Sequence, residues 1–278
     1  MKILIIGASG LLARPVILQL DKAGMELRLF SRSVNSSMFT NDYEMVQGDL
    51  FDDIDLEKAV EGCDAIHITA SVDDEYKSTE LIVNKARQKE VKLISYVSGA
   101  TVAEENRWFR FTDNKFRAEH LLMNSGIPYL IFRPTWFFES LQLMVRNGKA
   151  MIPGHLPHPY HFLSGDEFGS MVAKAFADPE KHNAVYYAFG PEEYLMKDLL
   201  ERYCREYHPE IKKVSEMPLF MMRVIAFMTG KKQLKGVAAL FSYFQKVKEP
   251  AVSEDELSKL VKPQVDFEQW LGMNRQMK

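Results

Sequence analysis

Short apolar stretches alternate with longer amphipathic stretches along the first two thirds of the chain. The apolar stretches are rich in β-branched and aromatic residues, which is typical of parallel strands covered by helices on both faces. We expect strands at Lys2–Ile6, Leu27–Phe30, Glu44–Gln47, Ala65–Thr69, Lys92–Val97 and Tyr129–Phe132. We expect helices between them at Leu11–Ala23, Leu56–Glu61, Tyr76–Lys89 and Lys115–Asn124. The alternation predicts an α/β protein with a doubly wound parallel (Rossmann) sheet, whose ligand crevice lies at the carboxyl ends of the strands.

The pattern becomes less regular after the sixth strand. A helix is expected to begin at Asp166, as its N-cap, and to end at Ala177, with a further strand at Val185–Phe189. The last third reads as mostly helical, with no repeat or low-complexity linker. We expect a Rossmann domain at residues 1–150, residues 166–190 packing back on it, and a smaller, mostly helical substrate subdomain at residues 191–278.

Two later helical stretches, Leu219–Met228 and Val237–Val247, are rich in methionine and phenylalanine. Such side chains suit the cover of a pocket beside the sheet, but methionine and phenylalanine at helical spacing are more often ordinary core. The most apolar stretch of this part, Met217–Met228, is interrupted by Arg223 and is shorter than the roughly 20 residues that a membrane span requires. We therefore expect no membrane association.

Composition and charge narrow the function classes. The 278 residues are 46% hydrophobic and 26% charged, which excludes a disordered chain and a disulfide scaffold. The net charge of −3 gives no general footprint for nucleic acid or for an anionic membrane, and a local basic patch is the alternative. Cys63 and Cys204 provide neither a disulfide framework nor metal-ligand spacing. The N-terminal apolar stretch is too short for a signal peptide. We expect a cytoplasmic protein that binds neither metal nor nucleic acid.

A glycine-rich segment, Gly7–Ala13, follows the first strand and opens the first helix. Glycine in this position allows a tight turn and close approach of the backbone to a pyrophosphate, and the helix N-terminus directs free N–H groups at the phosphates. A glycine turn with no ligand is the alternative. The segment predicts a dinucleotide site with contacts from Gly7, Ser9, Gly10, Leu11 and Leu12.

The end of the second strand reads Ser31-Arg32-Ser33, where enzymes that prefer NAD usually have an acidic residue for the ribose 2′-hydroxyl. The guanidinium of Arg32 suits a 2′-phosphate, and the two serines are possible hydroxyl donors. Stacking on adenine, or plain solvent exposure without discrimination, is the alternative. We predict that NADP(H) is preferred over NAD(H).

Further segments complete a family pattern: Gly48-Asp49-Leu50, Asp64, and Asn114-Lys115 through Glu119 to Arg133-Pro134. Over about residues 1–200 the chain resembles the extended and atypical short-chain dehydrogenase/reductases, most closely the NmrA-like NAD(P)-binding proteins. The resemblance implies that Asp49 and Leu50 contact the adenine, that Thr69, Ala70 and Ser71 line the nicotinamide ribose, and that the segment Pro134 to Trp136 lies beside the nicotinamide.

The chain departs from that family at the catalytic positions. The wider family uses Tyr-x-x-x-Lys with a serine, whereas this chain has Phe111 four residues before Lys115, and Gly99 at the expected serine position. Ser98 or Thr101 is a partial substitute. Lys115 can still bind the ribose hydroxyls or act as an acid or base, and a helix-surface salt bridge with Glu119 is its alternative. Chemistry that depends on the phenol is therefore disfavoured.

Hydride transfer to an acceptor that needs little acid catalysis remains, such as a quinone or an enone. The aromatic side chains of Trp136, Phe137 and Phe138 suit a flat apolar acceptor, or they form plain core. His155, His158 and His161 lie close together in the sequence without metal-ligand spacing, which favours a loop over the crevice, and one of them is a candidate for the missing proton donor.

The sequence thus predicts an NADP(H)-dependent oxidoreductase of the NmrA-like type that acts on an apolar small molecule, with a homodimer as the candidate assembly. A non-catalytic NAD(P)H sensor that acts through a protein partner is the second hypothesis, because both the phenol and the serine are missing. A nucleotide-sugar epimerase or dehydratase is the third.

Overall fold

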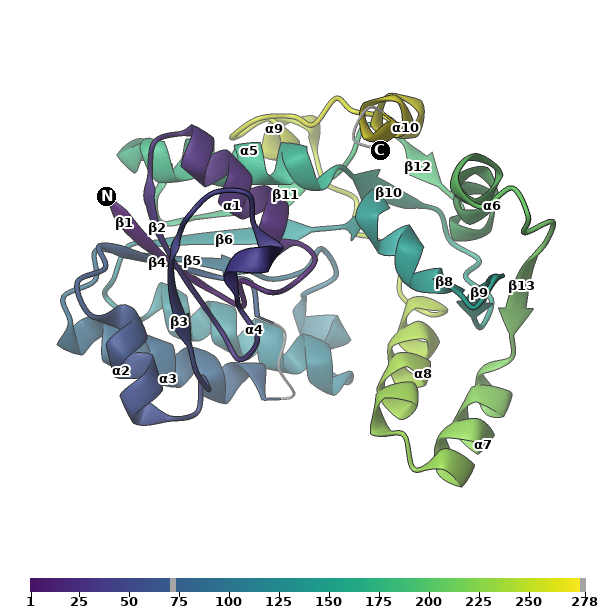
Figure 1. Cartoon of the computed structure of the whole chain (residues 1–278), viewed down its shortest axis with the longest axis horizontal. Helices are drawn as coiled ribbons and strands as arrows, with labels where there is room; N and C mark the ends of the chain where they lie inside the picture. Colours follow the sequence, from purple (N-terminus) through teal and green to yellow (C-terminus); the bar gives the residue numbers. More distant parts are fainter. Residues whose placement is uncertain (71–73, 276–278) are drawn as a thin grey trace. The chain divides into compact units, whose positions relative to one another are not determined.

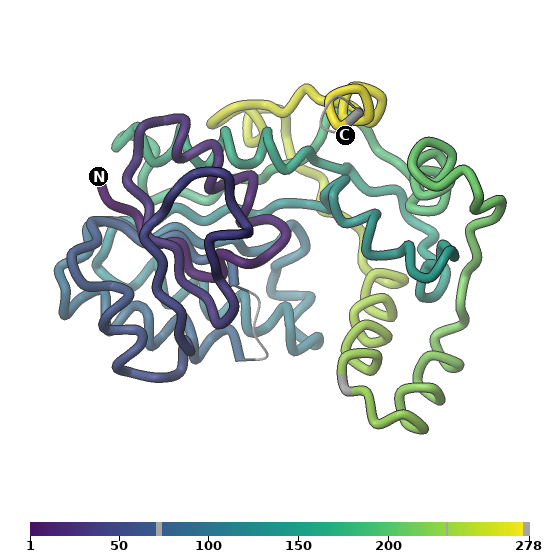
Figure 2. Tube along the Cα trace, viewed as in Figure 1, coloured from purple at the N-terminus to yellow at the C-terminus, as the bar shows by residue number. Residues whose placement is uncertain are grey.

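A computed structural model describes residues 1–70 and 74–275 (Figures 1 and 2). The chain divides into two compact units. Unit 1 comprises Met1–Pro134, Gly165–Ala188 and Val252–Pro263, and unit 2 comprises Thr135–Ser164, Phe189–Ala251 and Gln264–Lys278. Each unit is therefore assembled from segments that are far apart in the sequence.

Unit 1 is built on a seven-stranded parallel sheet with the strand order β11-β6-β5-β4-β1-β2-β3. The chain runs outward from β1 to β3, then returns to the other side of β1 and continues from β4 to β11. Adjacent strands that lead to opposite sides of a sheet create a crevice at their carboxyl ends, here between β1 and β4. The strands are β1 (Lys2–Ile6), β2 (Glu26–Ser31), β3 (Glu44–Gln47), β4 (Ala65–Ile68), β5 (Leu93–Val97), β6 (Tyr129–Pro134) and β11 (Ala184–Ala188).

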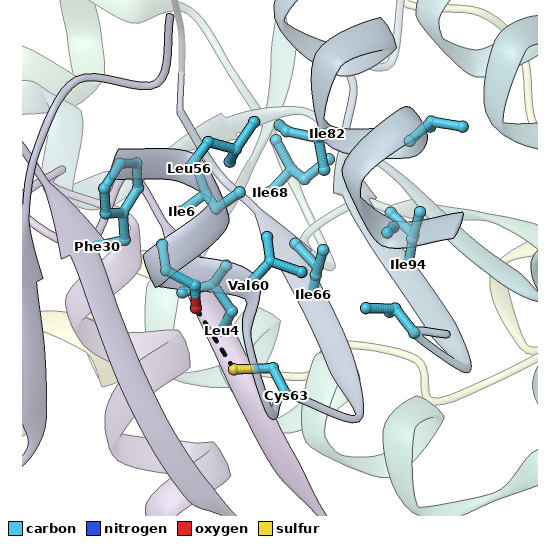
Figure 3. Packing of buried hydrophobic residues seen from close by; sticks show 14 of the residues in the cluster. Leu4, Ile6, Phe30, Leu56, Val60, Cys63, Ile66, Ile68, Ile82 and Ile94 are labelled. Carbon is cyan, nitrogen blue, oxygen red and sulfur yellow. Dashed lines mark hydrogen bonds between the residues drawn. The ribbon is translucent and has the colours of Figure 1, made fainter. Parts of the chain in front are cut away.

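Helices cover both faces of this sheet, with α1 and α5 packed together on one face and α2, α3 and α4 on the other (Figure 1). Alternate side chains of the central strands point to opposite faces: Leu4 and Ile6 of β1 and Ile66 of β4 pack under Leu56 and Ile82 of the second group of helices (Figure 3). The helices are α1 (Ala13–Lys22), α2 (Asp53–Val60), α3 (Glu75–Gln88), α4 (Arg110–Met123), α5 (Gly165–Ala177) and α9 (Glu254–Leu257), and the short 3₁₀ turns are η1 (Ser36–Met38), η2 (Glu104–Asn106) and η4 (Pro179–Lys181). The predicted Rossmann fold is confirmed.

The N-cap predicted for α5 is wrong. Asp166 was expected as the N-cap of its helix, but α5 already begins at Gly165, so Asp166 lies within the first turn. The carboxylate there still interacts favourably with the positive end of the helix dipole.

Unit 2 contains two three-stranded sheets, of order β12-β10-β7 and β13-β9-β8, in addition to its helices. Its core is aromatic: Phe138 stacks on Phe162 with ring centroids 5.9 Å apart and also contacts Phe267 and Trp270. Its elements are β7 (Trp136–Phe137), η3 (Phe138–Met144), β8 (Val145–Arg146), β9 (Lys149–Pro153), β10 (Tyr160–Leu163), β12 (Glu193–Tyr194), α6 (Met196–Tyr207), β13 (Val214–Met217), α7 (Leu219–Thr229), α8 (Lys232–Phe244) and α10 (Phe267–Arg275).

The two helices rich in methionine and phenylalanine differ in burial. Phe241 and Tyr243 of α8 are buried, as expected for a core helix, but Phe227 and Met228 of α7 are 91% and 78% exposed. The core interpretation is therefore wrong for the outer face of α7.

His67 of β4 gives the fold a pH dependence. The side chain is fully buried, its Nδ1 lies 2.9 Å from Ser95 Oγ, and burial lowers its pKa to about 3. The unfolded chain binds a proton below the ordinary pKa of about 6.5 and the folded chain does not, so stability falls as the pH falls below that value. We expect His67 alone to lower the free energy of unfolding by about 2 kcal/mol when the pH falls from 7 to 5.

Urea unfolding at pH 5 and pH 7 measures this effect. The variant His67→Gln removes the titrating group, so its loss of stability over the same range is expected to be smaller than that of the wild type by about 2 kcal/mol. Equal losses in the two proteins would show that His67 does not carry the effect.

Candidate functional site

The glycine loop lies between the end of β1 and the start of α1, at the crevice. The N–H groups of Gly7 and Ala8 donate to the carbonyl of Phe30 in β2, at 2.9 and 3.2 Å. Gly7 has a φ of +88°, and a Cβ on it would lie 2.7 Å from the Cα of Ala70, which follows β4. The loop therefore lies tightly against the ends of both neighbouring strands, and only glycine fits at position 7 without strain.

The N-terminus of α1 has unusual electrostatics for a helix start. Leu12 at the N-cap offers no side-chain hydrogen bond, and the first turn contains no acidic residue. It contains instead Arg14, whose side chain is exposed. A cation there opposes the helix dipole unless an anion binds nearby, so the site suits a pyrophosphate. Arg14 was not among the residues predicted for the site, although a basic residue directly after a glycine-rich turn is a signal that the sequence contains.

Arg32 and Ser33 follow β2 directly beside this loop. The hydroxyl of Ser33 donates a hydrogen bond to the hydroxyl of Ser9 at 3.1 Å, and the carbonyl of Arg32 accepts one from the side-chain amide of Gln47 at 2.7 Å. The Arg32 side chain is exposed and, within the described part of the chain, its guanidinium has no ion-pair or hydrogen-bond partner. The structure thus brings the predicted residues Gly7, Ser9, Gly10 and Arg32 together, with a guanidinium available to an anion.

The remaining adenosine-side residues follow β3. Asp49 is exposed, and its backbone N–H donates to the carboxylate of Asp55 at 2.9 Å, whereas Leu50 is 7% exposed and packs in the core of unit 1. On the other side of the loop, the N–H of Thr69 donates to Ile6 at 3.0 Å, and Ala70 contacts Gly7. Ser71, predicted beside the ribose, lies outside the described residues.

Lys115 of α4 is buried in an ion pair that the sequence did not indicate. Its Nζ lies 2.6 Å from Glu75 Oε1 of α3 and donates to the carbonyl of Val97 at 3.0 Å. The hydroxyl of Tyr96 donates to the same carboxylate oxygen at 2.7 Å. Glu75 is 1% exposed, and its Oε2 is buried without a hydrogen-bond partner among the described residues. The alternative of a surface salt bridge with Glu119 is therefore wrong, because α3 packs beside α4 and supplies the counter-ion.

Glu119 instead belongs to a second buried cluster. Its carboxylate accepts two hydrogen bonds from the guanidinium of Arg133, at 3.0 and 2.5 Å, and one from the hydroxyl of Ser98. Arg133 also donates to the hydroxyl of Tyr187 at 2.8 Å. Ser98, considered as a substitute for the missing serine, thus has its proton engaged by a structural carboxylate.

Phe111 occupies the position expected for the family's tyrosine. It lies one helical turn before Lys115, and the Lys115 ammonium lies 5.2 Å from the centre of its ring. A phenyl ring in that position contributes a cation–π contact and no exchangeable proton. The geometry is therefore that of a Tyr/Lys pair from which the acidic hydroxyl has been removed.

Pro134 and the aromatic residues that follow it are separated by the unit boundary. Pro134 ends β6 in unit 1, and its carbonyl accepts from Ala100 at 2.9 Å. In unit 2, Phe138 is fully buried in the aromatic core, which agrees with the core alternative for that residue. Trp136 is half-buried, and its Nε1 is enclosed without a hydrogen-bond partner among the described residues.

The histidines of unit 2 do not form one cluster. His161 Nδ1 lies 2.9 Å from Glu249 Oε2, and His155 Nδ1 lies 3.1 Å from Glu216. The hydrogen bond to Glu249 raises the pKa of His161, and burial raises the pKa of Glu249. Within residues 1–70 and 74–275, no three or more metal-ligating side chains lie close enough to hold a metal ion.

The glycine loop at the β1–β4 crevice defines a dinucleotide-binding protein of the Rossmann class. Residues 7–150 match the model of the NAD(P)H-binding family, and the chain belongs to that family. Among solved structures, the fold agrees with the atypical short-chain dehydrogenase/reductase and NmrA-like group that the sequence resembles. Within the described residues, no helix combines the length and the apolar character needed to cross a membrane.

Three proteins illustrate the similarity. Triphenylmethane reductase of Citrobacter sp., solved with NADP(H), superposes with a TM-score of 0.76 at 18% identity over 98% of this chain and 99% of that one. The NADPH-dependent quinone oxidoreductase of Escherichia coli, solved with NADPH, has a TM-score of 0.74 at 18% identity over 99% and 100% of the two chains. The photosystem II assembly factor Ycf39 of Trieres chinensis is 22% identical over 83% of this chain and 76% of its own.

Proposed function

We propose that the protein is an NADP(H)-dependent oxidoreductase that transfers a hydride to an apolar small-molecule acceptor such as a quinone or an enone. The observation that carries this proposal is the arrangement of the glycine loop, with Gly7 held against Ala70 and Arg32 uncommitted beside Ser9 and Ser33. We place the protein in the reducing cytoplasm, which the buried free thiols of Cys63 and Cys204 support.

Each part of the site has a distinct role in this proposal. The N-terminus of α1 and Arg14 bind the pyrophosphate, and Arg32 with Ser33 binds the 2′-phosphate. Lys115, oriented by Glu75, donates to the ribose hydroxyls next to the nicotinamide. The bound dinucleotide supplies the hydride, and the protein supplies position and orientation.

The loss of the tyrosine hydroxyl favours an acceptor that needs little acid catalysis. A conjugated acceptor places the negative charge left by hydride addition on a stabilised oxygen or carbon, so a strong proton donor is not required at that step. The folds of a quinone oxidoreductase and of a triphenylmethane reductase, both solved with NADP(H) or NADPH, support this class. An epimerase is disfavoured, because reversible oxidation of a hydroxyl needs the base that Phe111 lacks.

Arg32→Glu is expected to invert the preference for the dinucleotide. The guanidinium forms charge-assisted hydrogen bonds with a 2′-phosphate, whereas a carboxylate repels it and accepts from a 2′-hydroxyl. The affinity for NADPH is expected to fall roughly 10- to 100-fold relative to NADH, measured by fluorescence titration. Arg110→Glu, at an exposed position of α4, is the charge-matched control and is expected to leave the preference unchanged. An unaltered preference in Arg32→Glu would show that Arg32 does not read the 2′-phosphate.

Turnover is tested by following NADPH oxidation at 340 nm with a panel of quinones, enones and simple ketones. Sustained oxidation with the conjugated acceptors and none with the ketones is expected. Turnover of simple ketones at equal rates would contradict the acceptor class, because their reduction requires a proton donor.

A second candidate function is supported by two observations. Gly99 stands at the expected serine position, the hydroxyl of the neighbouring Ser98 donates to Glu119, and Phe111 replaces the phenol, so the usual serine and tyrosine hydroxyls are both lost. The curated relative from Trieres chinensis is named as an assembly factor. A non-catalytic NAD(P)H sensor would bind NADPH tightly, turn over no acceptor in the panel, and change its association with a protein partner when the dinucleotide is added.

A further inference from the structure

Helix α7 of unit 2 exposes a contiguous apolar surface. The helix has 11 residues, and most of its large apolar side chains face solvent. Their exposed fractions range from 37% for Ile225 to 91% for Phe227. The exposed apolar residues are Phe220, Met221, Val224, Ile225, Phe227 and Met228, which we call the α7 apolar face.

The α7 apolar face is one continuous side of the helix. At 3.6 residues per turn, its six residues span an arc of about 160°. The opposite side carries the buried residues Met222 and Ala226 and lies against α8, which runs beside α7 (Figure 1). The helix is thus packed on one side by its own unit, and the side with the largest apolar residues has no cover within the described part of the chain.

The segment around this face is strongly basic. Residues 217–248 contain six Lys and Arg residues and no Asp or Glu, whereas the whole chain has a net charge of −3. Arg223 flanks the apolar face on α7, and Lys231 and Lys235 follow at the turn and the start of α8; all three are exposed. An exposed apolar face bordered by cations, with no acidic residue between them, is complementary to an anionic lipid surface.

We propose that the α7–α8 hairpin binds the surface of an anionic lipid bilayer, with the α7 apolar face inserted at the level of the headgroups. At about 16 Å, α7 is too short to span the hydrocarbon core and long enough to lie in the interface plane. A second copy of the chain is a poorer occupant, because two such faces would bring their cations together. The expectation of no membrane association concerns helices that span a bilayer and the net charge of the whole chain, neither of which describes a short surface helix with a local basic border.

Vesicle co-sedimentation of the full chain tests the proposal. We expect binding to vesicles of equal parts phosphatidylcholine and phosphatidylglycerol, little binding to phosphatidylcholine alone, and release by high salt. The variant K231E/K235E is expected to bind roughly 25-fold more weakly or worse, since each cation near an anionic surface contributes about fivefold. The variant F220S/F227S/M228S is expected to lose at least about tenfold, because it removes three apolar side chains from the interface.

Matched controls separate insertion from general surface effects. Ile54→Ser removes a 77% exposed apolar residue from α2 of unit 1 and is expected to bind vesicles like the wild type. Circular dichroism confirms that each variant is folded. Absence of wild-type binding to the anionic vesicles, or equal binding by the triple variant, would overturn the proposal. A wild-type dimer that the triple variant converts to a monomer, without vesicle binding, would assign the face to a second copy instead.

Discussion

Gly7→Ala is expected to lower the affinity for NADPH by at least about 100-fold. The new Cβ would lie 2.7 Å from the backbone of Ala70, and the φ of +88° is unfavourable for alanine. The loop must shift to relieve the clash, and a shift of the backbone amides that bind the pyrophosphate removes more than one charge-assisted hydrogen bond. Isothermal titration calorimetry with NADPH measures the loss.

Gly24→Ala is the matched control for this variant. Gly24 also has a positive φ, of +76°, but a Cβ there meets nothing within 4 Å, and it lies beyond the opposite end of α1. Both variants carry the cost of the unfavourable backbone, whereas only Gly7→Ala disturbs the loop. Wild-type affinity in Gly7→Ala, or an equal loss in Gly24→Ala, would show that the close packing at Gly7 does not shape a phosphate site.

Lys115→Met is expected to lower the free energy of unfolding by about 3–5 kcal/mol. The substitution leaves the carboxylate of Glu75 buried beside Tyr96 without its cation. Removal of one partner from a buried ion pair costs more than removal of both, because the remaining charge is uncompensated. Urea unfolding measures the difference.

The double variant Glu75→Gln/Lys115→Met separates structure from chemistry. Loss of the unpaired charge is expected to restore most of the stability. If Lys115 also binds the dinucleotide ribose, the stable double variant still binds NADPH more weakly than the single variant Glu75→Gln. Equal affinity in these two variants would make Lys115 purely structural, and a double variant no more stable than Lys115→Met would contradict the ion-pair argument.

The sheet could be predicted well from the sequence because each buried parallel strand corresponds to one short, continuous apolar segment. Each central strand is buried on both faces and therefore reads as a short apolar run, and the central strand Lys2–Ile6 begins and ends where the pattern placed it. The edge strand Glu44–Gln47 also has the expected bounds, although two of its four residues are exposed. The glycine loop was predictable for a similar reason, since its chemistry is confined to seven consecutive residues between a strand and a helix. Helix ends were less accurate, and α4 begins five residues before the expected start at Lys115.

Contacts between distant segments could not be predicted in the same way. Lys115 and Glu75 are 40 residues apart, and only the packing of α3 beside α4 makes Glu75 rather than Glu119 the partner. The exposure of α7 could not be predicted either, because a mostly apolar helical segment is interpreted as core unless its neighbours are known. The small sheets of unit 2 consist partly of strands of two residues, such as β7, which are too short to give a pattern.

Calorimetric titration of the wild-type chain with NADPH and then with NADH tests the central claim most directly. Saturable binding of NADPH at one site per chain, tighter than that of NADH, is the predicted result. Absence of heat and of thermal stabilisation with either dinucleotide would contradict the assignment of the glycine loop as a dinucleotide site, and the proposed reaction would fall with it.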